Sequence, residues 1–326
     1  MSLKKSRLSI MGLAAILILL YHIYPVSNIS MFYNIEKYII KNSQLGVDMF
    51  FFCSAYMYKF SDKTNYKKFI IKKVIKIYPI FAISTFIYFI MGSIGIKQTL
   101  MTIIGIDFFL NGGGSFLWFI PAILILYSLL LIYEKLSTKY DKRKVLFVII
   151  FIFLLFIILS YKYSVNKSIN IFLFRFPIII LGCLLSHYEG RFIYRKKGIY
   201  SILLLIIGSI VNYIYFFKIK YNYIFVESFY ILSLPLVLGC ILFLDFIQGS
   251  INLKKLRVFG KISLELYCVQ MIIGFMLFEK LINFTQNRII SFLCDFIIIF
   301  IISWLYEKII RLISIKLSTI LAIYYK

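Results

Sequence analysis

Two ionisable side chains stand inside stretches of the sequence that are otherwise apolar. His22 lies near the end of the first apolar run, and Asp48 lies near the start of the next, within residues 46–52. Such groups are costly to place in hydrocarbon and are therefore candidates for function. A histidine can accept the proton of an attacking hydroxyl, and a carboxylate can orient the imidazole or stabilise its charged form. We predict that His22 is a general base and Asp48 its partner.

Each of these residues also has a structural interpretation. His22 would then be hydrogen-bonded between helices, or would simply end its span near the interface, and Asp48 would form a salt bridge to Arg175. The only other histidine, His187, falls at the far end of its apolar run, where we interpret it as an interfacial group. A serine nucleophile at Ser54 is a weaker hypothesis, since no nucleophile-elbow motif surrounds it.

Other polar residues fall at the same depth as His22. A helix rises about 1.5 Å per residue, and the hydrocarbon layer is about 30 Å thick. On that scale Arg175, Ser115 and Trp118 share the outer layer of the membrane with His22 and Asp48. Arg175 or the indole N–H of Trp118 is our candidate donor to an oxyanion. Because depth does not show which helices are neighbours, contact among these residues is a hypothesis.

A run of lysines precedes the third apolar run and is denser in charge than orientation in a membrane requires. Lys72, Lys73 and Lys76 belong to it. Lys73 and Lys76 are three residues apart, so on a helix they share one face. Such a pair suits the phosphates of a nucleotide-bearing donor, and we predict that these lysines bind the donor. The alternative is a topology signal that also binds anionic headgroups.

The composition places these residues in a membrane protein. Of the 326 residues, 62% are hydrophobic and 15% charged, whereas soluble domains are about 45–50% apolar. The net charge of +24 is spread over short clusters between the apolar runs, so we expect contact with the lipid bilayer and no nucleic-acid partner. The five cysteines all lie within apolar runs, and we predict neither disulfides nor a metal site.

The apolar runs are long enough to cross a bilayer, and we count about ten of them. With a cytoplasmic N-terminus, basic residues favour the inner side by about three to one. We therefore predict an all-α fold, a polytopic transmembrane helical bundle with both termini cytoplasmic, as a single integral membrane domain over residues 1–326. Residues 311–326 are predicted to form a short amphipathic cytoplasmic tail. The predicted spans are residues 8–25, 45–60, 71–92, 115–134, 145–161, 169–187, 199–217, 229–247, 263–281 and 288–310.

Six short motifs follow one another along the chain. They are Tyr21-His22; Gly46-Val47-Asp48-Met49-Phe50-Phe51; Lys73, Lys76 and Pro79; Leu117-Trp118-Phe119 with Tyr127; Arg175-Phe176-Pro177 with Gly182; and Gly260-Lys261-Ile262-Ser263 with Tyr267. In this order they resemble the acyltransferase 3 family of integral membrane acyltransferases. The motifs cover about residues 20–280, and we expect the matching region to span about residues 5–310.

The resemblance implies an O-acyltransferase, which transfers groups other than amino-acyl groups. The acyl group, commonly acetyl, would pass from cytoplasmic acyl-CoA to a hydroxyl of a cell-envelope glycan or glycolipid, in a bacterial plasma membrane and with no permanently bound cofactor. The resemblance also implies that His22 is catalytic and that Lys73 and Lys76 lie on the donor side. The residues predicted to bind the substrate are Arg175, Trp118, Ser115, Ser54 and Tyr127.

Four positions depart from the family pattern. The family often has an arginine at the position of Met11, so Arg175 would have to serve alone. The cytoplasmic basic pair consists of lysines here, which keeps the charge and loses bidentate geometry. A glycine that usually follows Ser54 is Ala55, and a histidine often found in the ninth span is Gln270, which cannot titrate. These departures bear on the rate and the donor more than on the fold.

A different class of function stays open on these residues. A transporter or flippase of an envelope glycolipid or small solute would use the same polar layer as a binding site. Pro121, Pro177 and Pro235 fall within spans and would allow broken helices, although the sequence has no internal repeat. A non-catalytic family member is a third alternative. The acceptor, the acyl chain length and assembly as a homo-oligomer or with other envelope enzymes are also left open.

Overall fold

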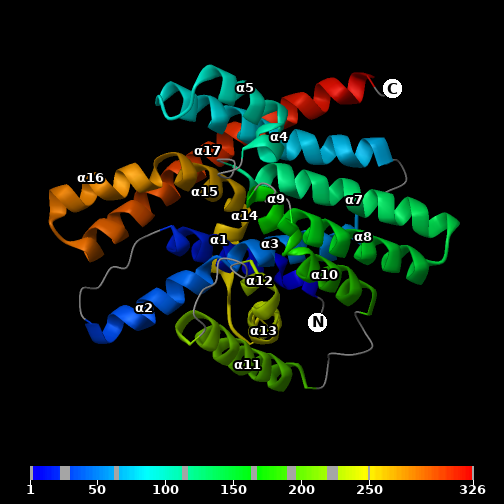
Figure 1. Cartoon of the computed structure of the whole chain (residues 1–326). Coiled ribbons are helices and arrows are strands. Elements are labelled where there is room, and N and C mark those ends of the chain that lie inside the picture. The colour runs from blue at the N-terminus through cyan, green and yellow to red at the C-terminus, as the bar shows by residue number, and fades with distance from the viewer. Residues whose placement is uncertain are drawn as a thin grey trace. The chain divides into compact units, whose positions relative to one another are not determined.

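The described part of the chain is built from helices and contains no strand (Figure 1). A computed structural model describes residues 3–22, 30–61, 66–111, 117–162, 167–188, 196–218, 227–248 and 250–324. The chain divides into two compact units. Unit 1 comprises Met1–Lys59 and Pro177–Leu305, and unit 2 comprises Phe60–Phe176 and Tyr306–Lys326.

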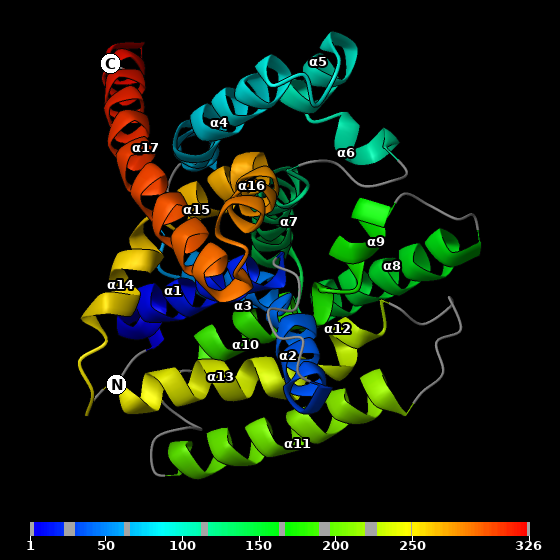
Figure 2. The ribbon, with the colours of Figure 1, turned by 90° about the vertical axis from the view of Figure 1, so that its left-hand side faces the viewer.

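Unit 1 is arranged around α1, which packs against α2, α3, α13, α14 and α15. Outside this group, α11 runs beside α13 (Figure 2). The helices of this unit are α1 (Leu3–Tyr21), α2 (Ser30–Ser43), α3 (Gly46–Tyr58), α10 (Phe176–Tyr188), α11 (Lys197–Phe217), α12 (Phe229–Leu232), α13 (Leu234–Ile247), α14 (Lys254–Lys261), α15 (Ser263–Val269), the π-helical turn Gln270–Gly274, α16 (Phe275–Thr285) and the first part of α17 (Arg288–Tyr324).

Small residues allow α1 to approach its neighbours closely. A Cβ atom at Gly12 of α1 would overlap the carbonyl oxygen of Leu256, and one at Gly260 would overlap that of Leu8. The two glycines therefore form a reciprocal crossing between α1 and α14. Gly46 likewise brings the start of α3 against the carbonyl of Ala14. Small residues at such crossings are the usual means of close packing between membrane helices.

Unit 2 contains a second group of helices, in which α4 packs against α5 and α7, and α7 packs against α8. The end of α17 also belongs here, because the Tyr306 hydroxyl lies 3.1 Å from that of Ser84, and the Ser314 hydroxyl donates to the Ile75 carbonyl at 3.2 Å. Besides this end of α17, the helices of unit 2 are α4 (Tyr66–Ile90), α5 (Ile96–Ile104), α6 (Asp107–Leu110), α7 (Phe119–Lys139), α8 (Lys142–Lys162) and α9 (Lys167–Leu173).

The structure confirms the all-α fold, and every predicted span overlaps one or more helices. Among the described residues, 5 helices are long and apolar enough to cross a membrane, or 6 if α14 and the helix after its 60° bend count as one span. The total of ten spans and the cytoplasmic termini stay predictions.

Three parts of the sequence between the predicted spans form helices that the hydropathy pattern did not indicate. The helices α2, α5, α6 and α14 all lie in segments that we predicted as connections between spans. At the C-terminus, α17 continues without a break to Tyr324, so the segment predicted as a separate tail extends the last helix as far as the structure describes it. Its position on the inner surface stays a prediction.

Candidate active site

His22 is the residue that directly follows α1. Its backbone N–H donates to the Leu19 carbonyl at 3.3 Å, and its ring meets the Tyr21 ring edge-on with 5.2 Å between centroids. The side chain is half-buried. An imidazole at the end of a helix that is packed along its length has a fixed backbone and a partly open side chain, which suits a group that must meet a substrate.

Asp48 lies in the first turn of α3, beside the last turns of α1. The start of α3 is placed there by Gly46, which contacts the Ile18 side chain. The Asp48 residue is 1% exposed, and a carboxylate in a first helical turn is favoured by the helix dipole. The structure thus carries His22 and Asp48 on neighbouring helix ends, while a direct bond between their side chains stays a prediction.

Ser54 lies farther along α3 and is half-buried. This part of α3 is contacted by α10, because a Cβ atom at Gly182 would come within 2.7 Å of the Phe52 carbonyl oxygen. The glycine of the fifth sequence motif therefore serves close helix packing.

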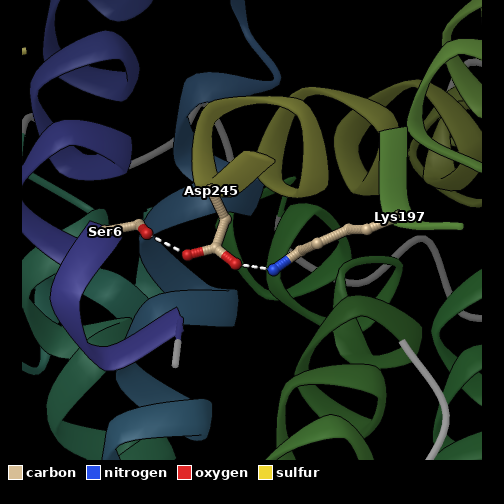
Figure 3. A network of polar contacts seen from close by, with 3 residues as sticks. All are labelled: Ser6, Lys197 and Asp245. Atoms are coloured by element: carbon tan, nitrogen blue, oxygen red, sulfur yellow. Dashed lines mark hydrogen bonds and ion pairs between the residues drawn. The ribbon is translucent and has the colours of Figure 1, made fainter. Parts of the chain in front are cut away.

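The N-terminal half of α1 is fixed by a buried polar network that sequence reasoning missed. The Ser6 hydroxyl donates to one oxygen of Asp245 on α13, and the other oxygen pairs with the ammonium group of Lys197 on α11 (Figure 3). One turn farther along, the Ser9 hydroxyl donates to the Gln248 side chain at 3.1 Å. Lys197 is one of the basic residues between predicted spans whose bias sets the predicted orientation, and the structure places it in a buried ion pair. The signal that could have found Asp245 is a carboxylate inside an apolar run.

The C-terminal end of α1 is contacted from the π-helical turn. The Gln270 amide nitrogen donates to the Ile18 carbonyl at 3.0 Å in a buried hydrogen bond. The helix that carries His22 is therefore held by polar contacts near both ends and by glycine crossings between them.

Unit 2 brings together two of the predicted substrate-binding residues. The guanidinium carbon of Arg175 lies 5.4 Å from the centre of the Trp118 ring, and Arg175 is 2% exposed. One guanidinium nitrogen also donates to the Ile171 carbonyl at 3.1 Å. A cation–π contact of this kind is stronger when the cation is shielded from water.

A second pair in unit 2 joins a predicted donor residue to a predicted substrate residue. The Lys73 ammonium lies 4.4 Å from the centre of the Tyr127 ring and 5.3 Å from that of Phe69. Lys72 and Lys76 are exposed on the same helix. Because two rings lie beside it, Lys73 is only partly exposed to solvent, whereas its predicted partner Lys76 is exposed.

The predicted site residues divide between the two units. His22, Asp48 and Ser54 belong to unit 1, and Ser115 lies outside the described residues. Within the described ranges, no group of three or more histidine, cysteine, aspartate or glutamate residues could hold a metal ion. The remaining predicted residues belong to unit 2: Arg175, Trp118, Tyr127, Lys72, Lys73 and Lys76.

Comparison with known families decides the class of this protein. A family model described as an acyltransferase domain, acyltransferase 3, matches residues 11–308. The chain belongs to the acyltransferase 3 family. No curated protein and no solved structure matches it. The family and the long apolar helices together make this protein a multi-pass membrane acyltransferase, and they confirm the resemblance read from the six sequence motifs.

Proposed function

We propose that this acyltransferase transfers an acyl group, with acetyl expected, from cytoplasmic acyl-CoA to a hydroxyl of a cell-envelope glycan or glycolipid. The observation that carries the proposal is the placement of His22. It is half-buried at the end of a helix that is packed along its length, and the buried carboxylate of Asp48 lies on the adjacent helix start, within the region that matches the family.

In the proposed reaction His22 accepts the proton of the acceptor hydroxyl. The hydroxyl oxygen then forms a bond to the thioester carbonyl carbon, and the carbon–sulfur bond of the donor breaks. The proton held by His22 passes to the leaving thiolate, directly or through water. Asp48 stabilises the charged imidazole between these steps. The products are an O-acyl ester and free coenzyme A, so the atoms balance without any other reactant.

The residues of unit 2 supply binding and charge stabilisation in this proposal. Arg175, shielded by the Trp118 ring, is the candidate donor to the oxyanion that forms on the carbonyl. The exposed Lys72 and Lys76, with Lys73 beside them, attract the phosphates of the donor. Ser54, Ser115 and Tyr127 would contact the acceptor. We place the protein in a bacterial plasma membrane, with assembly as a homo-oligomer or with envelope enzymes left open.

The proposal is tested with purified protein, labelled acetyl-CoA and envelope glycolipid as acceptor, with the product identified by mass spectrometry. Wild-type protein should form an O-acetyl ester and release one coenzyme A for each ester. Loss of the general base in His22→Ala should lower the rate by about 10²–10⁴-fold.

The chain offers a matched control for this experiment. The only other histidine, His187, is exposed near the end of α10, so His187→Ala should keep the wild-type rate. Transport of labelled acceptor without ester formation, or full transfer by His22→Ala, would contradict the proposal.

A further inference from the structure

The last turn of α1 has a three-residue hydrogen bond at His22, the proposed general base. In a regular helix the His22 N–H would donate to the Ile18 carbonyl, four residues earlier. The structure gives this N–H a bond to the Leu19 carbonyl, three residues earlier, at 3.3 Å, which is the spacing of a 3₁₀ turn. Helix ends leave their last carbonyls without intrahelical partners. The Ile18 carbonyl accepts a hydrogen bond from another helix, since Gln270 donates to it at 3.0 Å.

Gln270 is placed for this contact by an irregular segment. It is the first residue of the π-helical turn Gln270–Gly274 and is 6% exposed. Gly274, at the other end of this turn, lies beside the Gln270 side chain, since a Cβ atom there would be in van der Waals contact with the Gln270 Cγ at 3.4 Å. Single π-helical turns within α-helices are frequent at functional sites. Here the turn carries an amide that reaches across to α1.

Ile18 also connects this contact to the other proposed catalytic residue. Its side chain meets Gly46 at the start of α3, two residues before Asp48. One residue of α1 is therefore held through its carbonyl by Gln270 and through its side chain by α3. The backbone that leads to His22 starts from this fixed point.

We propose that Gln270 is a positioning residue for His22. Gln270 caps the Ile18 carbonyl and so fixes the direction in which α1 presents the imidazole. The inference rests on the proposed function. It also gives a use to a residue that cannot titrate, since an amide donates this hydrogen bond at every pH at which the protein is folded. Gln270 need not touch the substrate.

The test compares variants of the two glutamines that contact α1 at opposite ends. Gln270→Leu removes the donor and keeps most of the volume, and Gln270→Glu replaces it by a group of the same shape. Because displacement of a catalytic group by about 1 Å costs about 10²-fold, we expect kcat to fall by about 10- to 100-fold in both, with the KM for the acceptor within about twofold of wild type. Gln270→His, which retains an N–H donor, should recover most of the rate. Gln248→Leu, at the other end of α1, should retain wild-type kcat.

A second measurement reads the position of His22 without acyl transfer. In a His187→Ala background His22 is the only histidine, so its modification by diethyl pyrocarbonate can be followed by mass spectrometry. The rate of modification should change at least about threefold when Gln270→Leu is added, because the half-buried ring gains or loses access. Gln248→Leu should leave it unchanged.

The outcomes separate this inference from the proposed function. An inactive His22→Ala together with a fully active Gln270→Leu would overturn the inference and leave the general base in place. An active His22→Ala would remove the general base, and the modification rate would then decide whether Gln270 positions His22. Equal modification rates in the presence and absence of Gln270→Leu would overturn the inference in either case.

Discussion

Loss of one member of the buried ion pair between Lys197 and Asp245 should destabilise unit 1. Replacement of both members by apolar residues should destabilise it much less. Lys197 is 9% exposed and Asp245 is 2% exposed, and the pair joins α11 to α13, while Ser6 attaches α1 to the same carboxylate. Lys197→Met leaves the carboxylate with only the Ser6 hydroxyl. Asp245→Leu removes the carboxylate that pairs with the buried ammonium group.

The magnitude follows from this burial. Removing one member of a buried ion pair destabilises a protein by about 3–5 kcal/mol, because the other charge stays buried and unpaired. At about 2–4 °C for each kcal/mol in a domain of this size, the melting temperature of either single variant should fall by at least about 6 °C. Replacement of both residues by apolar ones is often neutral. The double variant Lys197→Met/Asp245→Leu should therefore recover most of the loss.

The assay is thermal unfolding of the purified protein in detergent, followed by the fraction that remains monodisperse in size-exclusion chromatography. An exposed ion pair provides the control. Glu307 and Arg311 lie 3.8 Å apart on α17, with the Arg311 side chain 64% exposed. Surface pairs of this kind contribute about 0–1 kcal/mol, so Arg311→Met should shift the melting temperature by at most about 4 °C.

Two results would refute this reasoning about the ion pair. Single variants that melt within about 2 °C of wild type would mean that the charges are not buried together. A double variant that is less stable than both single variants would mean that the pair contributes more than the mutual neutralisation of two buried charges.

Three further predictions follow from the packing and the site. Gly12→Leu should abolish recovery of folded protein from membranes, because its side chain would overlap the Leu256 carbonyl, whereas Gly95→Ala, which meets nothing within 4 Å, should be recovered at the wild-type level. Trp118→Leu should lower kcat for acyl transfer by about 3- to 30-fold through loss of the cation–π contact with Arg175, and Trp118→Phe should lie between it and wild type; equal rates in all three would contradict the contact. Lys76→Met should raise the KM for acetyl-CoA by about tenfold, measured at low ionic strength, while Lys97→Met on α5 should not change it; equal KM values would remove this lysine from the donor site.

Hydropathy predicted where the helices lie, because a run of apolar residues of bilayer length has few alternatives to a helix. It failed at α2, whose composition is mixed and whose position depends on contacts with another helix. Tyr38 of α2 donates to the Ser209 carbonyl at 2.8 Å, and Asn42 accepts from Asn212 at 2.6 Å. Such contacts come from tertiary structure, which a sequence window does not contain.

The same limit applies to the candidate site. Depth along the spans indicated that Arg175 and Trp118 share a layer, and the structure shows that they are in contact. Depth could not indicate that Asp245 pairs with Lys197, since pairing depends on which helices are neighbours. Nor could it indicate the role of Gln270, which depends on a π-helical turn and on a carbonyl of another helix.

In the proposed reaction the imidazole of His22 accepts the proton of the acceptor hydroxyl. The most direct measurement is the single-turnover rate of acetyl transfer to the glycolipid acceptor by purified wild-type protein, His22→Ala and His187→Ala at equal concentration. We expect His187→Ala to match wild type and His22→Ala to be slower by about 10²–10⁴-fold. A His22→Ala rate within about twofold of wild type would contradict it.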